Sequence, residues 1–290
     1  METRHIVEID EVISKDGTKI GYRRLGKGPG LVIVHGVLQS SQCHMELAQS
    51  PLSAHFTIYL PDRRSRGLSG NLLDTYCVQT EVDDLAEILD ETDASFVLGI
   101  NSGALICLEA TLSLPAIQKT ALFEPPLSIN SSIPTDFLDR FDREIAAGKI
   151  ASALVTGMLG AKIGPPFLQK LPRWFLRGYV KYRLKREERR SQDGDVTMRM
   201  LAPTLHHDLA MIKEMSNTHL KYKDLRQEVL LMGATKSPTY LQIPLVELES
   251  ILPNATRIQF EGLCHTATGN TNRGGHPERV AEELLRFFIR

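Results

Sequence analysis

The apolar positions along the chain follow two spacings, which predict strands and helices in alternation. Residues 6–24 alternate apolar and polar side chains around Asp16-Gly17-Thr18, the pattern of a β-hairpin. Helical spacing occurs at residues 80–92, from just after residue 104 to about residue 114, and at residues 276–288. Short apolar runs typical of strands buried on both faces occupy residues 31–34, 56–60, 95–100, 120–123, 229–232 and 256–260. This order predicts an α/β fold, a mostly parallel twisted sheet with helices on both faces.

A long segment between two of these strands lacks buried-strand runs. Phe137, Phe141 and Ile145 recur every four residues, and Trp174 to Leu184 is a second helical candidate. The segment is predicted to be an inserted helical lid above the carboxyl ends of the strands. The predicted organisation is therefore a core domain in two parts, residues 1–127 and 208–290, with the lid at residues 128–207.

Composition and charge narrow the classes of partner. The 290 residues are 42% hydrophobic and carry a formal net charge of −1, so no overall field attracts nucleic acid or an anionic membrane. The basic stretch Lys181–Arg190 alternates with acids and predicts a solvated helix face. Four scattered cysteines show no metal or disulfide spacing, and the first ten residues lack a signal-peptide pattern. We expect a cytoplasmic protein acting on a small molecule without cofactor or metal, with a homodimer as an open alternative.

One predicted strand runs directly into a helix through Gly99-Ile100-Asn101-Ser102-Gly103. Small residues flank the middle position, as a sharp strand-to-helix turn requires, because the turn strains the backbone of that residue. The turn directs its middle side chain, here Asn101, into the crevice at the carboxyl edge of the sheet. Ser102 is the alternative occupant, but Ile100 would then lie where a small residue is needed. A further alternative is a tight connection without function.

Three other segments are predicted to bring candidate functional residues to the same edge of the sheet. His35-Gly36-Val37, Asp62–Gly70 and Gly262–His265 each follow a predicted strand, and His276–Val280 opens the last helix. With the turn at Gly99–Gly103, these segments resemble the α/β-hydrolase superfamily, in order and over nearly the whole chain apart from the lid. The Asp-Arg-Arg-x-Arg-Gly-x-Ser stretch and the His-Pro-Glu-Arg-Val ending are similar to its small esterase, lactonase and dehalogenase-like branch.

The resemblance implies roles for individual residues. His265 matches the catalytic histidine, whose imidazole can move a proton near neutral pH. The backbone N–H groups of Val37 and Ser102 match the oxyanion hole. Residues 234–236, a usual place for the acid partner, hold no carboxylate. Glu124, at the end of the strand after the turn, is therefore the predicted partner that orients His265. A structural bond from Glu124 to the lid is the alternative.

The main departure from the family is Asn101, which matches the nucleophilic serine. A neutral carboxamide is a poor nucleophile, so no acyl-enzyme is expected at residue 101. The retained histidine and oxyanion hole suit proton abstraction beside a carbonyl, and hence cyclase, isomerase or lyase chemistry on a small, apolar, biosynthetic carbonyl compound. Two alternatives stay open. One is an ester or lactone hydrolase using His265-activated water or Ser102, and the other is a ligand-binding pseudoenzyme.

The lid is expected to determine which substrate enters. Its large apolar side chains would line an apolar cavity above the turn. The residues predicted to contact the substrate are Trp174, Met158 and Phe167.

Overall fold

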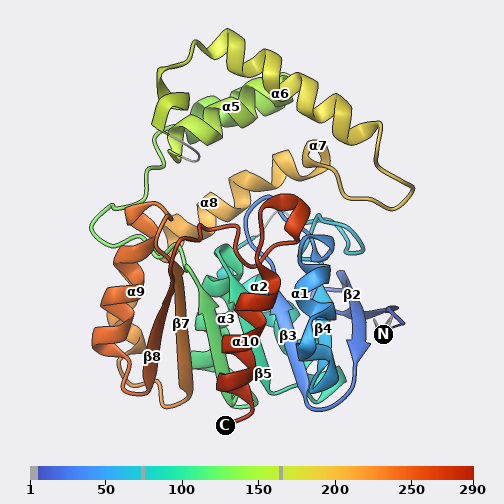
Figure 1. Cartoon of the computed structure of the whole chain (residues 1–290), viewed down its shortest axis with the longest axis vertical. Helices are drawn as coiled ribbons and strands as arrows, with labels where there is room; N and C mark the ends of the chain where they lie inside the picture. The colour runs from blue at the N-terminus through green and yellow to red at the C-terminus, as the bar shows by residue number, and fades with distance from the viewer. Residues whose placement is uncertain (1–5, 73–75, 163–165) are drawn as a thin grey trace.

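The sheet is the framework of the molecule. The computed structural model describes residues 6–72, 76–162 and 166–290, and within them eight strands form one sheet in the order β1-β2-β4-β3-β5-β6-β7-β8 (Figure 1). β1 and β2 pair antiparallel, β2 pairs antiparallel with β4, and all remaining pairs are parallel. The strands are β1 (Glu8–Ile13), β2 (Lys19–Gly26), β3 (Gly30–Val34), β4 (Thr57–Pro61), β5 (Phe96–Ile100), β6 (Lys119–Phe123), β7 (Glu228–Ala234) and β8 (Ala255–Phe260). The predicted hairpin and the mostly parallel sheet are confirmed.

Helices cover both faces of the sheet because its central strands are apolar on both sides. Val32 and Val34 of β3 pack into one core cluster, whereas Leu31 and Ile33 pack into the other. The first cluster is covered by α2 (Val78–Thr92), α3 (Ser102–Ser113) and α9 (Thr239–Ile251). The second is covered by α1 (Met45–Gln49), the short 3-10 helix η2 (Pro51–Ala54) and α10 (Pro277–Phe288). The spacing of apolar residues predicted α2, α3 and α10 but not α9, whose interior contains Pro244.

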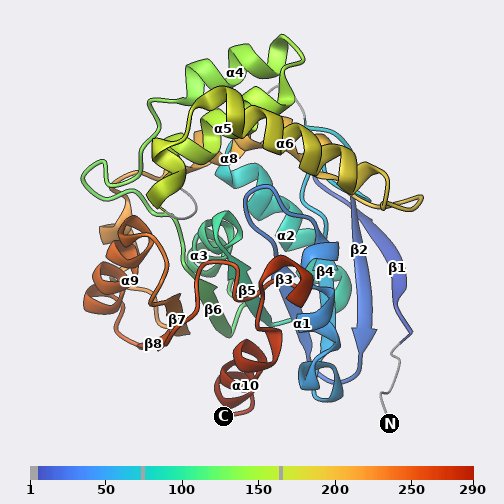
Figure 2. The ribbon, with the colours of Figure 1, turned by 45° about the horizontal axis from the view of Figure 1, so that its top comes forward.

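A helical layer lies beyond the carboxyl ends of the parallel strands (Figures 1 and 2). It lies between β6 and β7 in the chain, and α4 packs on α5, which packs on α6. Phe141 of α4 is fully buried there. The helices of this layer are α4 (Leu138–Ala146), α5 (Ile150–Gly160), α6 (Arg173–Glu188), α7 (Met198–Leu201) and α8 (Leu205–Glu214).

The last of these helices belongs to the layer and to the core at once. α8 begins at Leu205 and packs against α3, so the predicted lid boundary at residue 207 falls inside it. The division at residues 127 and 207 stays a prediction. Across the described residues, no helix combines the length and apolar character needed to span a bilayer.

Candidate active site

The strand-to-helix turn is the strained point of the site. β5 ends at Ile100, α3 begins at Ser102, and Asn101 between them has φ 50° and ψ −121°. A positive φ on a residue with a Cβ costs free energy and persists only where the surroundings enforce it. The flanking glycines permit this packing. A Cβ on Gly99 would lie 2.4 Å from Cα of Ala104, and one on Gly103 would lie 2.2 Å from the Val34 carbonyl oxygen.

The side chain of Asn101 caps the helix that follows it. Its Oδ1 accepts a hydrogen bond from the backbone N–H of Ser102 at 2.9 Å. The predicted oxyanion donor of Ser102 is therefore already engaged by the neighbouring carboxamide. This contact also fixes the amide orientation, because only an oxygen can accept from that N–H. Among the described residues, Nδ2 of Asn101 has no hydrogen-bond partner, so it remains available as a donor.

The hydroxyl of Ser102 is committed to a buried network. Its Oγ donates to Oδ1 of Asp208 at 2.9 Å and accepts from Nη1 of Arg63 at 2.9 Å. Ser102 is fully buried and is not among the cavity-lining residues of the described chain. A hydroxyl held between a guanidinium and a carboxylate beneath the turn cannot approach a substrate in this arrangement.

Arg63 is the centre of that network. Its guanidinium bonds to both carboxylate oxygens of Glu81 and to Oδ1 of Asp208 at 2.8 Å. Oδ2 of Asp208 accepts from Arg66 at 2.6 Å. Burial opposes the charge of Arg63, but Glu81 and Asp208 outweigh it and hold the pKa of Arg63 well above its usual value. Burial also raises the pKa of Asp208, but Arg66 and Arg63 outweigh it, so that pKa lies below the usual range.

A cavity of about 1080 Å³ lies above the turn and reaches into the helical layer. It brings together Val37, Asn101, His265 and Met158, which come from the loop after β3, the turn after β5, the loop after β8 and α5. Among the residues described, the backbone N–H of Val37 has no hydrogen-bond partner. The apolar part of the wall comes mainly from the helical layer and includes Ile133, Phe137, Leu154, Leu205 and Leu209.

His265 lines the cavity without a partner for its ring in the described parts of the chain. Burial lowers the pKa of His265, which favours the neutral imidazole. A neutral ring can accept a proton. His35, in contrast, is structural, because its Nε2 accepts from the backbone N–H of Arg63 at 3.1 Å and its Nδ1 donates to the Gly36 carbonyl at 3.2 Å.

The structure does not make the predicted bond between Glu124 and His265. Glu124 is 1% exposed, and its Oε1 instead accepts from the backbone N–H of Ala234 at 2.8 Å. This bond joins the ends of the neighbouring strands β6 and β7. Oε2 is buried without a partner in the described chain, and burial raises the pKa of Glu124 to about 7. Because the carboxyl group of Glu124 binds the end of β7, it does not orient His265 in this structure.

Two of the three predicted substrate contacts also lie elsewhere. Trp174 is 68% exposed and Phe167 is 60% exposed, and neither is part of the cavity wall among the described residues. Helical spacing alone does not say which face of a lid helix points inward. Other residues of α6 line the cavity, including Arg183 and Arg186, which are also exposed, as the sequence predicts for that stretch. Met158 does line the cavity, and its contact with a substrate stays a prediction.

The buried network was not predicted from the sequence. Asp208 belongs to a His-His-Asp segment that offers a weak metal-like pattern, whereas its actual partners lie some 140 positions earlier at Arg63 and Arg66. The Asp-Arg-Arg-x-Arg stretch was the sequence signal that could have revealed this network. Several arginines directly after a buried strand are expected to be buried themselves, and buried guanidinium groups need acidic partners.

Comparison with known proteins identifies the family. The model of the Alpha/beta hydrolase family matches residues 31–282. The chain belongs to this family. The solved alpha/beta hydrolase from Sphaerobacter thermophilus DSM 20745 is 30% identical, covers 96% of this chain and 100% of its own, and superposes with a TM-score of 0.76.

More distant alpha/beta hydrolases share the fold. An esterase from Rhodococcus sp. ECU1013 is 22% identical over 96% of this chain and 98% of its own, with a TM-score of 0.65. An esterase from Exiguobacterium antarcticum is 16% identical over 97% of this chain and 99% of its own, with a TM-score of 0.70. The match extends over nearly the whole of each chain, including the helical layer.

Proposed function

We propose that this alpha/beta hydrolase family member is an enzyme that moves a proton on a small, largely apolar carbonyl compound without forming a covalent intermediate. The observation that carries the proposal is the pair of residues at the base of the cavity. A carboxamide, Asn101, occupies the strained turn, and an unpaired imidazole, His265, lines the same cavity in the described chain. The adjacent hydroxyl of Ser102 is held below the turn by Arg63 and Asp208.

His265 acts as the base in this proposal. Its lowered pKa keeps the imidazole neutral at physiological pH, the form that removes a proton from carbon beside a carbonyl. The developing enolate oxygen then accepts hydrogen bonds from Nδ2 of Asn101 and from the backbone N–H of Val37. Because the N–H of Ser102 is bonded to Asn101, the carboxamide replaces that backbone group as the donor. Aldol-type cyclisation, isomerisation by movement of a proton beside a carbonyl, and retro-aldol cleavage each pass through such an enolate.

Hydrolysis by water that His265 activates is the second candidate. This candidate is favoured by the kinds of protein among the similar structures, which include esterases and an epoxide hydrolase. It needs no attacking atom from the turn. The third candidate, a ligand-binding protein without turnover, is favoured because no acid in the described chain partners His265.

Isotope incorporation separates the three candidates. A panel of β-keto esters and lactones is incubated with the protein in D₂O and, separately, in ¹⁸O-labelled water, and each compound is analysed by mass spectrometry. We expect deuterium at the carbon beside the carbonyl faster than in a control without enzyme, and no ¹⁸O in a carboxylate product, with at least about a hundredfold loss of the enzyme-dependent exchange rate in His265→Ala. The matched control is His55→Ala, which removes an exposed histidine of the connection after η2.

The outcomes are distinct. Enzyme-dependent ¹⁸O in a carboxylate product would replace the proposal by hydrolysis. Ligands that bind but gain label no faster than in the control without enzyme, and are otherwise unchanged, would replace it by a binding role. Exchange that survives in His265→Ala would remove His265 as the base.

A further inference from the structure

One side of the cavity carries four arginines. Arg183, Arg186 and Arg190 line it from α6 and the residues that follow that helix, and Arg273 lines it from the 3-10 helix η6 (Thr271–Arg273). η6 follows the loop that holds His265, so the lid and the core contribute guanidinium groups to the same space. This concentration of positive charge occurs in a chain whose formal net charge is −1.

The arginines of the lid form one stripe along the end of α6 and the residues after it. Arg183 and Arg186 are three residues apart on the same side of α6, and Arg190 follows two residues after the helix ends at Glu188. Like charges at these spacings repel each other and destabilise a helix. The three side chains are exposed, so water and salt screen this repulsion, and an anion bound there would reduce it further.

No acid in the described chain neutralises most of this stripe. Arg186, Arg190 and Arg273 form no ion pair among the described residues. Arg183 is partly engaged, because its Nη1 donates to the hydroxyl of Tyr179 at 3.0 Å and its guanidinium lies 5.9 Å from the centre of that ring.

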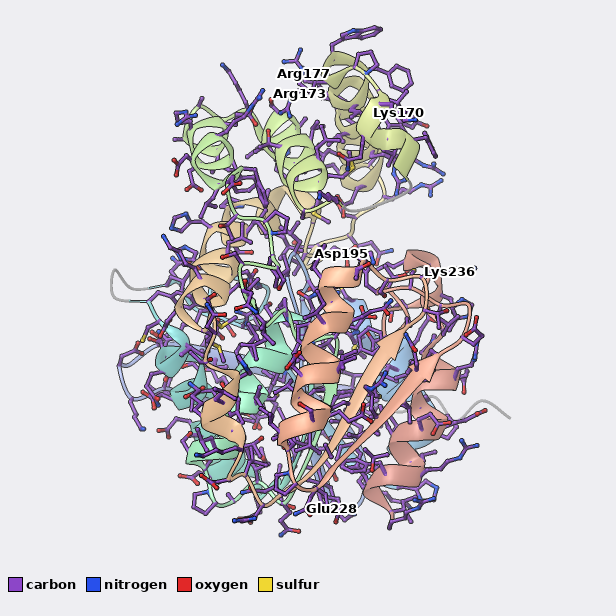
Figure 3. All side chains as sticks on the ribbon, turned by 90° about the vertical axis from the view of Figure 1, so that its left-hand side faces the viewer. Lys170, Arg173, Arg177, Asp195, Glu228 and Lys236 are labelled. Carbon is purple, nitrogen blue, oxygen red and sulfur yellow. The ribbon has the colours of Figure 1, made fainter. Side chains whose placement is uncertain are left out.

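The two acidic residues of the cavity wall form hydrogen bonds with backbone N–H groups and, in the described part of the chain, no ion pair with these arginines. Oε2 of Glu187 accepts from the N–H of Met198 at 3.1 Å, and Oδ2 of Asp195 accepts from the N–H of Gln192 at 2.8 Å. Four arginines therefore face two carboxylates whose hydrogen bonds serve the loop after α6. Figure 3 shows Asp195 where the lid meets the core, whereas Arg173 and Arg177 lie near the top of the lid, away from that boundary.

We infer that the cavity binds an amphipathic carboxylate, with its anionic group at Arg186, Arg190 and Arg273 and its apolar body along the apolar wall. A guanidinium is always charged and matches the two oxygens of a carboxylate geometrically. Ile133, Leu154 and Met158 supply apolar contacts in the same cavity. The ligand therefore needs a charged end and an apolar body. This binding property does not depend on the reaction at His265, because it is measured without turnover.

Calorimetry with two ligands of equal length tests the inference. Octanoate carries the carboxylate, and octanamide is its uncharged counterpart. We expect octanoate to bind at least about tenfold more tightly to the wild-type protein. In the triple variant Arg186→Gln/Arg190→Gln/Arg273→Gln, the affinity for octanoate should fall to that for octanamide, while octanamide binding stays within about twofold.

The matched control removes the same charge elsewhere. The variant Arg177→Gln/Arg189→Gln/Arg226→Gln changes three exposed arginines that do not line the cavity among the described residues. It should retain the tenfold preference. Circular dichroism melting checks that both triple variants are folded. Equal affinities of the two ligands for the wild type, equal losses in both triple variants, or no binding of either ligand would each overturn the inference.

Discussion

Asn101 combines a structural and a chemical property in one side chain. Its oxygen caps α3 through the N–H of Ser102, and its Nδ2 is left as a donor at a cavity-lining position. Its backbone is strained at φ 50°, and the side chain supplies no attacking oxygen. Strain of this kind is costly and persists only where the surroundings enforce it, here through the close approach of Gly103 to β3.

Glu124 links the stability of the protein to pH. Burial raises its pKa from the usual value of 4.5 to about 7. A carboxyl with a higher pKa in the folded state binds its proton more tightly there than in the unfolded chain. The free energy of unfolding therefore loses this contribution as pH rises from about 4.5 through about 7.

Glu124→Gln should remove that loss. The amide keeps the shape of the protonated carboxyl, so the variant and the wild type should be equally stable near pH 4.5. At pH 8 the variant should be more stable by about 3 kcal/mol, measured by urea unfolding. Glu278→Gln, at an exposed carboxylate of α10, should show no such difference. A Glu124→Gln effect that is independent of pH would contradict the assignment.

Among the elements, α8 is coupled to the turn through charge rather than through apolar packing alone. Asp208 of α8 is fully buried and binds Arg63 and Arg66 of the loop after β4, and it also accepts from Ser102 at the start of α3. Three segments that are distant in sequence therefore meet at one carboxylate. A shift of α8 would change the surroundings of the strained turn directly.

Asp208→Asn should destabilise the fold strongly. The substitution leaves two buried guanidinium groups with a single carboxylate, and breaking a buried pair costs about 3–5 kcal/mol. Thermal unfolding followed by circular dichroism would measure the loss. Asp142→Asn is the matched control, because its partner His206 is on the surface and such pairs contribute less than about 1 kcal/mol. Similar losses in the two variants would show that the network does not hold α8 in place.

For the whole molecule, the decisive feature is the cavity between the helical layer and the sheet. Its wall takes Asn101 and His265 from the core and most of its apolar groups, together with several arginines, from the helical layer, so neither part forms the site alone. Two large aromatic side chains of the helical layer, Trp174 and Phe167, are mostly exposed and do not line the cavity in the described chain.

A volume change on the inner side of the lid should therefore alter binding, whereas a change on its outside should not. Met158→Trp should reduce the affinity for octanamide at least about fivefold, because the larger ring occupies cavity space. Trp174→Gln should leave that affinity within about twofold, since its side chain is 68% exposed. Titration calorimetry of both variants measures the two effects. A larger effect of Trp174→Gln than of Met158→Trp would place the ligand outside this cavity.

The fold class and the place of the turn could be predicted from the sequence alone. Alternation of period two, short doubly buried strands and the spacing of small residues in Gly99–Gly103 are local properties, because neighbouring residues alone set them. They predicted the hairpin, the parallel sheet and the strand that leads into Asn101. α9 was not predicted, because Pro244 interrupts a helical pattern that tertiary packing nonetheless stabilises.

The roles of the side chains in the site depend instead on tertiary contacts. The partner of Ser102 lies on α8, the partner of Glu124 lies on β7, and arginines of α6 line a cavity although they are also exposed. Each of these outcomes depends on which group from a distant part of the chain lies close enough to form a hydrogen bond or an ion pair with the side chain. A hydrogen bond or an ion pair acts only within a few ångströms, and no spacing along the chain specifies such a contact between residues far apart in sequence.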